Sequence, residues 1–127
     1  MTGEMQVHEV TVDRRLSRGT HPGRDYQGRC YELVFKYMAG HRVTEPDLRL
    51  VHGTLLIVGV PYPHAWVEIP GGIVFDPVDQ LFFNRDGYYQ TLHAESGPVY
   101  TPPEAEQRAV TTKHYGPWHE TATTQTP

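Results

Sequence analysis

Three residues of the chain, Cys30, His64 and Asp76, have the types and the order of a thiol nucleophile, a base and an orienting acid. A carboxylate that accepts a hydrogen bond from one imidazole nitrogen fixes the tautomer and leaves the other nitrogen to act as a base. A thiolate beside an imidazolium is ready for acyl transfer. We therefore predict a Cys–His–Asp triad. The structural alternatives are a core cysteine, a histidine on an exposed sheet face and an Asp-Pro turn.

The thiol lies at the start of a predicted helix, CYELVFKYMAG, residues 30–40. Its apolar residues recur at the spacing of one helical face and are Leu33, Val34, Tyr37 and Met38. We expect Gly40 to cap the C-terminal end. A helix N-terminus and the adjacent Arg29 both stabilise an anion, which favours a reactive thiolate at Cys30.

The stretch PHAWVEIPGGIVFDP, residues 63–77, decides whether His64 and Asp76 meet. Alternate side chains of a strand share one face, so HAWVEI presents an apolar face and a polar one. The polar face carries His64, Trp66 and Glu68. A three-residue loop at 70–72 puts Asp76 on this polar face, whereas a two-residue turn would bury the carboxylate among apolar side chains. We predict the three-residue loop and a His64–Asp76 pair.

The remaining patterns predict an α+β fold, in which a helix precedes an antiparallel meander and short helices follow. The expected strands are 5–12, 48–60 with interruptions at Gly53 and Gly59, 64–69 and 73–78, and the expected loop is 14–27. Pro61 and Pro63 are expected to end the second strand. The later helices are 86–94 and 102–113, the second opened by a capping box at Thr101 and Glu104.

The composition predicts one domain, residues 1–118, with a flexible tail at 119–127. The formal charge of -4 gives no basic footprint for nucleic acid, and no apolar run approaches a membrane span. The mean hydropathy of -0.53 is low, but two Trp, eight Tyr and four Phe argue against disorder. A single cysteine and the absence of a signal-like N-terminus favour a cytoplasmic location.

The order and spacing of GRCYELVFKYM, HAWVEI and IVFDP resemble the transglutaminase-like branch of the papain-like cysteine enzymes. The spacing is similar to that of the family's compact bacterial members, among which are the leader peptidases of lasso-peptide maturation, and the resemblance covers about residues 28–78. It implies a papain- or transglutaminase-like fold, with a nucleophile helix packed on a small antiparallel sheet. It also implies a thiol hydrolase or acyltransferase of the peptidase, amidase, deamidase or transglutaminase type. The substrate would be an amide or isopeptide bond of a peptide or protein, and no cofactor is implied.

In such folds the backbone N–H of the cysteine and one nearby side chain stabilise the oxyanion. The candidates for that side chain, or for contact with the substrate, are Gln27, Tyr26, Trp66 and His52.

Two other functions fit the same residues. One is a catalytically silent binding or inhibitor module that uses an aromatic cleft to hold a partner. The other is a metal site made by His64, Glu68 and Asp76, since the chain has eight histidines, although it lacks HxH, HExxH and CxxC motifs. The aromatic run LFFNRDGYY, residues 81–89, is expected either to cover the cleft or to form a dimer surface.

Overall fold

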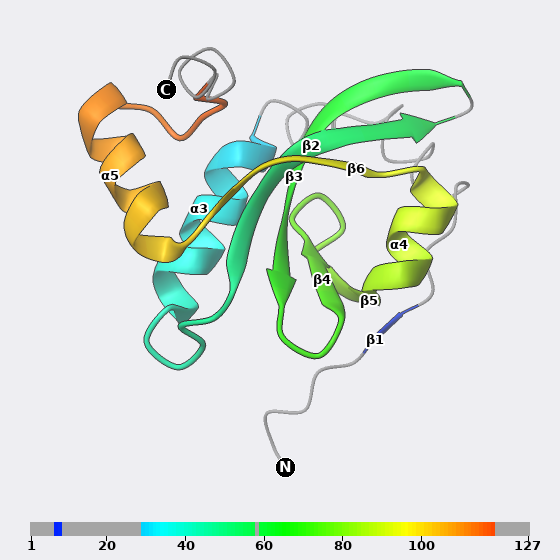
Figure 1. Cartoon of the computed structure of the whole chain (residues 1–127), viewed down its shortest axis with the longest axis horizontal. Helices are drawn as coiled ribbons and strands as arrows, with labels where there is room; N and C mark the ends of the chain where they lie inside the picture. Colours follow the sequence, from blue (N-terminus) through cyan, green and yellow to red (C-terminus); the bar gives the residue numbers. More distant parts are fainter. Residues whose placement is uncertain (1–6, 9–28, 58, 119–127) are drawn as a thin grey trace.

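The computed structural model describes residues 7–8, 29–57 and 59–118 of the chain. These residues form one sheet with helices on both faces, so the fold class is α+β, as predicted (Figure 1). The elements in chain order are β1 (Val7–His8), α3 (Cys30–His41), β2 (Arg49–Ile57), β3 (Val60–Ile69), β4 (Ile73–Asp76), β5 (Leu81–Asn84), α4 (Arg85–Leu92), β6 (Glu95–Tyr100) and α5 (Pro102–Thr112).

The strands are ordered β1-β5-β4-β3-β2-β6 across the sheet. Strands β2 to β6 form a five-stranded antiparallel sheet, and the short β1 is added parallel to β5. Strand β3 lies in the middle, between β2 and β4. This central strand carries His64, and the next strand, β4, ends at Asp76.

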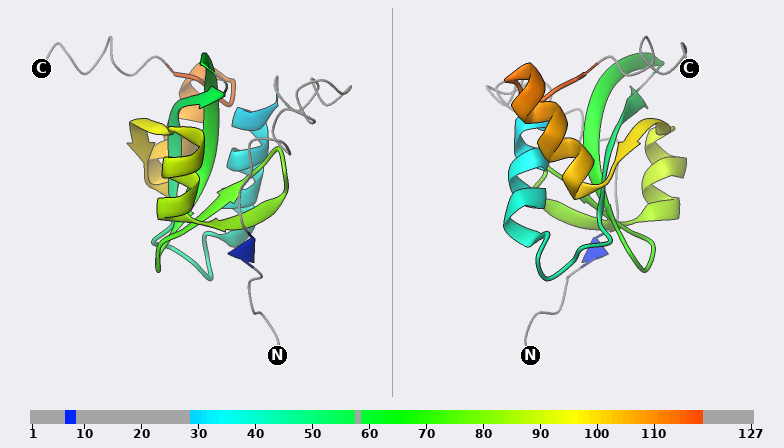
Figure 2. Two further views of the ribbon diagram at one scale, coloured as in Figure 1. Left: turned by 90° about the vertical axis from the view of Figure 1, so that its right-hand side faces the viewer. Right: turned by 60° about the vertical axis from the view of Figure 1, so that its left-hand side comes forward.

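Two buried clusters lie on opposite faces of the sheet. Helices α3 and α5 cover one face and α4 covers the other (Figure 2). The α3-side core consists of Cys30, Val34, Met38, Leu48, Leu50, Ala65, Val67, Ile69, Phe75, Val78, Tyr100, Ala105 and Trp118. The α4-side core consists of Val51, Leu55, Trp66, Val74, Phe83, Tyr88 and Leu92. Consecutive residues of β3 alternate between the two cores, as a strand requires.

Helix α3 begins at Cys30, as predicted, but it does not end at Gly40. It continues to His41, and the capping residue Arg42 keeps right-handed helical backbone angles. The ring of His41 stacks on that of Tyr37 at a centroid distance of 3.9 Å, and its Nδ1 lies 2.8 Å from the Tyr37 carbonyl oxygen. These contacts stabilise the last turn, so no left-handed glycine cap is needed.

The hairpin of β2 and β3 corrects two expectations. Gly53 does not interrupt β2; it lies where an added Cβ would be 2.2 Å from the Glu95 carbonyl oxygen of β6, so a glycine lets the strands approach. Pro61 and Pro63 do not end a strand either, because both lie inside β3. Alternate positions of a strand direct their N–H groups to the same edge, so two prolines there fit the edge of β3 that faces away from β2.

The loop between β3 and β4 has the predicted three residues. Ile69 pairs with Ile73 and Val67 with Phe75, which leaves residues 70–72 as the connection. Gly71 and Gly72 have φ angles of 97° and 76°, a region that favours glycine. The register therefore matches apolar residues on the α3 side and directs Asp76 to the other side.

The second half of the chain contains both predicted helices and two strands that were not predicted. The capping box of α5 is present, since Thr101 and Glu104 each bond the other's backbone N–H. Helix α4 begins after Asn84, whose side chain accepts a hydrogen bond from Gly87 N–H. Strands β5 and β6 are the additions. Most of the predicted strand 5–12, the loop 14–27 and the tail 119–127 lie outside the described residues.

Candidate functional site

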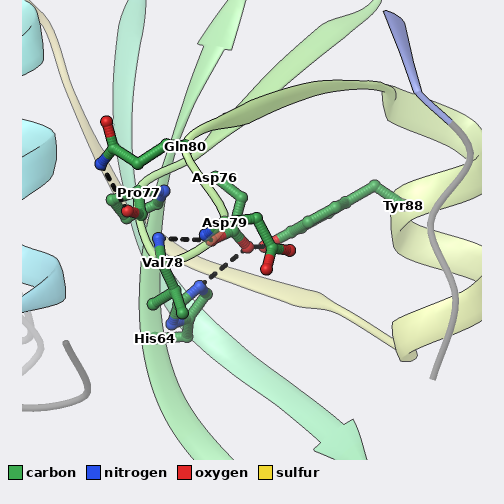
Figure 3. Close-up of polar contacts among 7 residues, drawn as sticks. All are labelled: His64, Asp76, Pro77, Val78, Asp79, Gln80 and Tyr88. Atoms are coloured by element: carbon green, nitrogen blue, oxygen red, sulfur yellow. Dashed lines mark hydrogen bonds and ion pairs between the residues drawn. The ribbon is translucent and has the colours of Figure 1, made fainter. Parts of the chain in front are cut away.

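The structure brings His64 and Asp76 together. The Nε2 atom of His64 lies 3.0 Å from Oδ2 of Asp76, as the three-residue loop predicted (Figure 3). The imidazole is 6% exposed and the carboxylate is completely buried. An ionised carboxylate accepts hydrogen bonds only, so Nε2 carries the proton in this pair. The tautomer thereby assigned leaves Nδ1 as the basic nitrogen of a neutral ring.

Asp76 is held by several donors besides His64. Its Oδ1 accepts hydrogen bonds from the backbone N–H groups of Val78, at 2.8 Å, and Asp79, at 3.4 Å. The Gln80 N–H bonds the carbonyl oxygen of Asp76 at 2.8 Å. The expected Asp-Pro turn is therefore real, and the same aspartate also binds the imidazole. The turn fixes the carboxylate, and the carboxylate fixes the ring.

Tyr88 is a further member of this site that the sequence did not reveal. Its hydroxyl donates to Oδ2 of Asp76, the oxygen that also receives His64 (Figure 3). Tyr88 is fully buried in the first half of α4 and points toward the end of β4. Its spacing from Leu92, the other buried residue of α4, indicates that both face the sheet. That spacing was a usable signal for burial, but not for the contact with Asp76.

Glu68 and Trp66 share the face of His64, as predicted, but Glu68 does not join Asp76. Its carboxylate accepts hydrogen bonds from Trp66 Nε1 and Arg85 Nε, both at 3.1 Å, and from the Tyr89 hydroxyl. These contacts engage both oxygens of the Glu68 carboxylate. Among the described residues no group of three or more His, Cys, Asp and Glu side chains is arranged to hold a metal ion.

Cys30 is the first residue of α3, as predicted, and it is 1% exposed. It belongs to the α3-side core together with Ala65 and Val67. Arg29 precedes it and forms an ion pair with Glu32, with 3.2 Å between Nε and Oε1. The positive charge expected beside the thiol is thus shared with a carboxylate of the same helical turn.

The thiol and the imidazole belong to different faces of β3. His64 lies on the face of Trp66, which is part of the α4-side core, whereas Cys30 packs with Ala65 in the α3-side core. Strand β4 pairs with β3 only along residues 67–69 of β3, so the part of β3 before Val67 has no β4 residue beside it. The chain that follows β4 can therefore reach both faces of the sheet at this point. Val78, which bonds the same carboxylate as His64, belongs to the α3-side core. The turn after Asp76 therefore contacts both sides.

His52, the other candidate on the sheet, lies on the side of Cys30. It pairs with Ala65 across β2 and β3, and its ring contacts Tyr31 of α3 at a centroid distance of 4.8 Å. Burial lowers the pKa of His52 to about 4. Burial, and secondly the charge of Cys30, raise the pKa of Tyr31 to about 12. The candidates Tyr26 and Gln27 lie outside the described residues.

The comparisons with known proteins identify no relative. No family model matches the chain. No curated protein matches it. No solved structure matches it. Within the described part of the chain, no helix is long and apolar enough to cross a membrane.

Proposed function

We propose that the chain is a cysteine-dependent acyl-transfer enzyme that acts on an amide or isopeptide bond of a peptide or protein. Cys30 is the nucleophile, His64 the base and Asp76 the residue that orients His64. The observation that carries the proposal is the buried His64–Asp76 pair, with 3.0 Å between Nε2 and Oδ2. Carboxylate-oriented imidazoles of this kind serve as general bases. The resemblance to transglutaminase-like enzymes supports the same assignment.

The contacts of Asp76 suit an orienting acid. Two backbone N–H groups bond Oδ1, and the Tyr88 hydroxyl bonds Oδ2 beside His64. Hydrogen bonds to a carboxylate favour its charged form, which in turn stabilises the imidazolium that forms during the reaction. Because Nε2 of His64 is held by Asp76, the proton of the thiol goes to Nδ1.

The proposed reaction has two halves. In the first, Cys30 Sγ forms a bond to the carbonyl carbon, its proton passes to Nδ1 of His64, and the carbonyl electron pair moves to the oxygen. When the pair returns, the C–N bond breaks and the amine leaves with the proton from His64. In the second half, water or an amine attacks the thioester and restores the thiol. Water gives hydrolysis or deamidation, and an amine gives a new amide.

The thiol can meet the imidazole only around the edge of β3, since their side chains belong to different faces. The turn 77–80 lies at that edge, and its Val78 links the carboxylate of Asp76 to the core around Cys30. The proposal therefore requires the first turn of α3 and this turn to approach each other when substrate enters. Catalytic contacts commonly tighten in the substrate complex.

Alkylation of Cys30 with iodoacetamide tests the proposal, and because the chain has one cysteine every label reports on it. The rate at pH 6 is expected to exceed that of the urea-unfolded chain and to fall about tenfold in His64→Ala. Asp76→Asn should lower it less. His93→Asn is the matched control, because this exposed residue has the left-handed backbone that asparagine tolerates. Equal rates in the native chain and His64→Ala at pH 6 would contradict the proposal.

A second function is favoured by one observation, the 1% exposure of Cys30. A thiol packed among core side chains is an ordinary small apolar residue. In that case the chain is a binding or inhibitor module, and His64–Asp76 is a structural pair. The two functions differ in one measurement: the module predicts that Cys30 stays unlabelled until the chain unfolds, with a labelling rate that follows the stability of each variant.

A further inference from the structure

His52 is a buried imidazole whose ring nitrogens form no hydrogen bond with the described residues. It is 5% exposed, and neither Nδ1 nor Nε2 has a hydrogen-bond partner within the part of the chain that the structure describes. A buried polar group without a partner costs about 1–3 kcal/mol, so its presence needs a reason. The triad proposed above does not use this residue.

Three aromatic rings surround His52. Those of Tyr100 and Trp118 each lie 5.1 Å from it between centroids, and that of Tyr31 lies 4.8 Å away. Tyr100 and Trp118 belong to the same core as Cys30, and Tyr31 follows Cys30 in α3. His52 therefore contacts aromatic residues of the core to which the proposed nucleophile belongs, on the same side of the sheet.

The segment His114–Trp118 covers His52. Gly116 lies so close that an added Cβ would be 2.7 Å from Cε1 of the ring, and its φ angle is 116°. The described hydrogen bonds of the segment join its own residues and the end of α5, for example Trp118 Nε1 to the His114 carbonyl oxygen at 3.0 Å. The segment thus covers the imidazole by ring and van der Waals contact, without satisfying its nitrogens.

We propose that His52 is a substrate-binding residue: its ring N–H donates a hydrogen bond to the carbonyl oxygen of an acyl substrate at Cys30, in the space that His114–Trp118 fills in the free protein. The inference rests on the proposed function and deepens it. As the Cys30–carbon bond forms, the carbonyl oxygen gains negative charge, and a fixed donor stabilises that charge. The segment must move aside before the substrate binds.

The chemistry of His52 selects this ligand. Burial keeps the pKa of His52 at about 4, so near pH 7 the ring is neutral and has one N–H donor and one acceptor. Walls made of three aromatic rings favour an uncharged group over an ion. An amide carbonyl is uncharged and accepts a hydrogen bond. A neutral imidazole can act as such a donor when its surroundings lower its pKa.

Two thiol reagents and the variant His52→Leu test the inference. A diglycyl chloromethyl ketone carries the carbonyl that His52 would bind, whereas methyl methanethiosulfonate modifies Cys30 without a carbonyl. In His52→Leu the rate with the ketone is expected to fall at least about tenfold relative to the rate with the thiosulfonate. Thermal unfolding of the same variant should show an equal or higher midpoint, because an apolar side chain replaces unsatisfied nitrogens.

Gly116→Ala tests the covering segment without changing His52. The added methyl group meets the ring and is strained at a positive φ, so the segment should leave the site and both reagents should label Cys30 several-fold faster. Gly59→Ala is the matched control, since Gly59 has a φ of 76° but open space around it. It should leave both rates unchanged.

The outcomes separate the two proposals. Ketone labelling that depends on His64 but is equal in the native chain and His52→Leu would overturn the role of His52 alone. The absence of ketone labelling in the native chain and in Gly116→Ala would overturn the proposed function, and the role of His52 with it. Equal labelling rates in Gly116→Ala and Gly59→Ala would show that the segment does not cover the site.

Discussion

Two buried histidines on neighbouring strands of this sheet differ in the hydrogen bonding of their ring nitrogens among the described residues. His64 on β3 is bonded to Asp76, whose carboxylate is itself held by Tyr88 and by backbone N–H groups. His52 on β2 is equally buried, but among the described residues its nitrogens have no partner and its neighbours are aromatic rings. Similar burial therefore accompanies one imidazole with fixed proton positions and one that is neutral and unengaged.

The difference shows what burial of a polar side chain does and does not indicate. At His64 the hydrogen bond to Asp76 offsets the cost of removing the ring from water. The pair therefore both stabilises the fold and fixes the orientation of the ring. At His52 the ring contacts are favourable, but they leave the nitrogens unsatisfied. The first site is thus organised in the free protein, whereas the second, under the proposal above, gains a hydrogen-bond partner when a substrate carbonyl binds. Four predictions test this contrast.

The largest expected effect is that of Asp76→Ala. The change leaves His64, the Tyr88 hydroxyl and two backbone N–H groups without their shared acceptor in the interior. We expect the free energy of unfolding to fall by about 3–5 kcal/mol, measured by urea denaturation at pH 7. Asp47→Ala, a change at an exposed aspartate, should stay within about 0.5 kcal/mol of the native chain. A loss below about 1 kcal/mol for Asp76→Ala would remove the contrast between the two histidines.

The second prediction concerns the pH dependence that His52 causes. Its pKa is about 4 in the folded chain and 6.5 as the ordinary value, so between these pH values the unfolded chain binds more protons. The free energy of unfolding therefore has its full value above pH 6.5 and falls by up to about 3 kcal/mol as the pH decreases toward 4, because protonation favours the unfolded chain. The variant His52→Leu lacks this group, and its stability should fall less over the same range.

The measurement for this prediction is the urea midpoint of both chains at pH 7 and pH 4.5. Acidic side chains titrate in both, so the difference between the two chains isolates His52. Parallel losses of stability in the native chain and in His52→Leu would mean that the imidazole is protonated or solvated in the folded state. His52 and His64 would then differ only in their hydrogen-bond partners and not in how strongly burial disfavours the charged ring.

The His64–Asp76 pair could be predicted from the sequence because it depends on local rules. Alternation along HAWVEI assigns the faces, and only the three-residue loop places Asp76 on the face of His64. The expectation that this face would spare the carboxylate from burial was wrong, because α4 covers the face and Asp76 is completely buried. The start of α3 at Cys30 followed from periodicity in the same way. Each of these inferences needed residues that are close in the chain.

Features that depend on packing between distant elements could not be predicted. Tyr88 reaches Asp76 only because α4 lies on the face opposite α3, and periodicity does not state on which face a helix packs. The position of His52 beneath Trp118 likewise depends on the return of the chain after α5. The prediction that Pro61 and Pro63 end a strand was wrong because a proline stops a strand only where its missing N–H is needed for pairing.

The third prediction compares one substitution at both histidines. His64→Leu leaves the buried Asp76 carboxylate with one donor fewer, and we expect a loss of about 2 kcal/mol in the free energy of unfolding. His52→Leu should cause no loss at pH 7, since no described partner is left unsatisfied. Urea denaturation of the two variants side by side gives the comparison. Equal losses would indicate that both rings contribute by packing rather than through their nitrogens.

The smallest expected effect is that of Tyr88→Phe, which removes one hydroxyl and keeps the described donors His64 Nε2 and the N–H groups of Val78 and Asp79 on Asp76. A hydrogen bond to a charged group contributes about 1.5 kcal/mol, so the stability should fall by about that amount in urea denaturation. Tyr62→Phe, at a position 39% exposed, should cause no change. Because Tyr88 shares Oδ2 with Nε2 of His64, its loss should also alter the pH profile of Cys30 alkylation. A change in stability without any change in that profile would assign Tyr88 to the fold alone, and the carboxylate would orient His64 without its help.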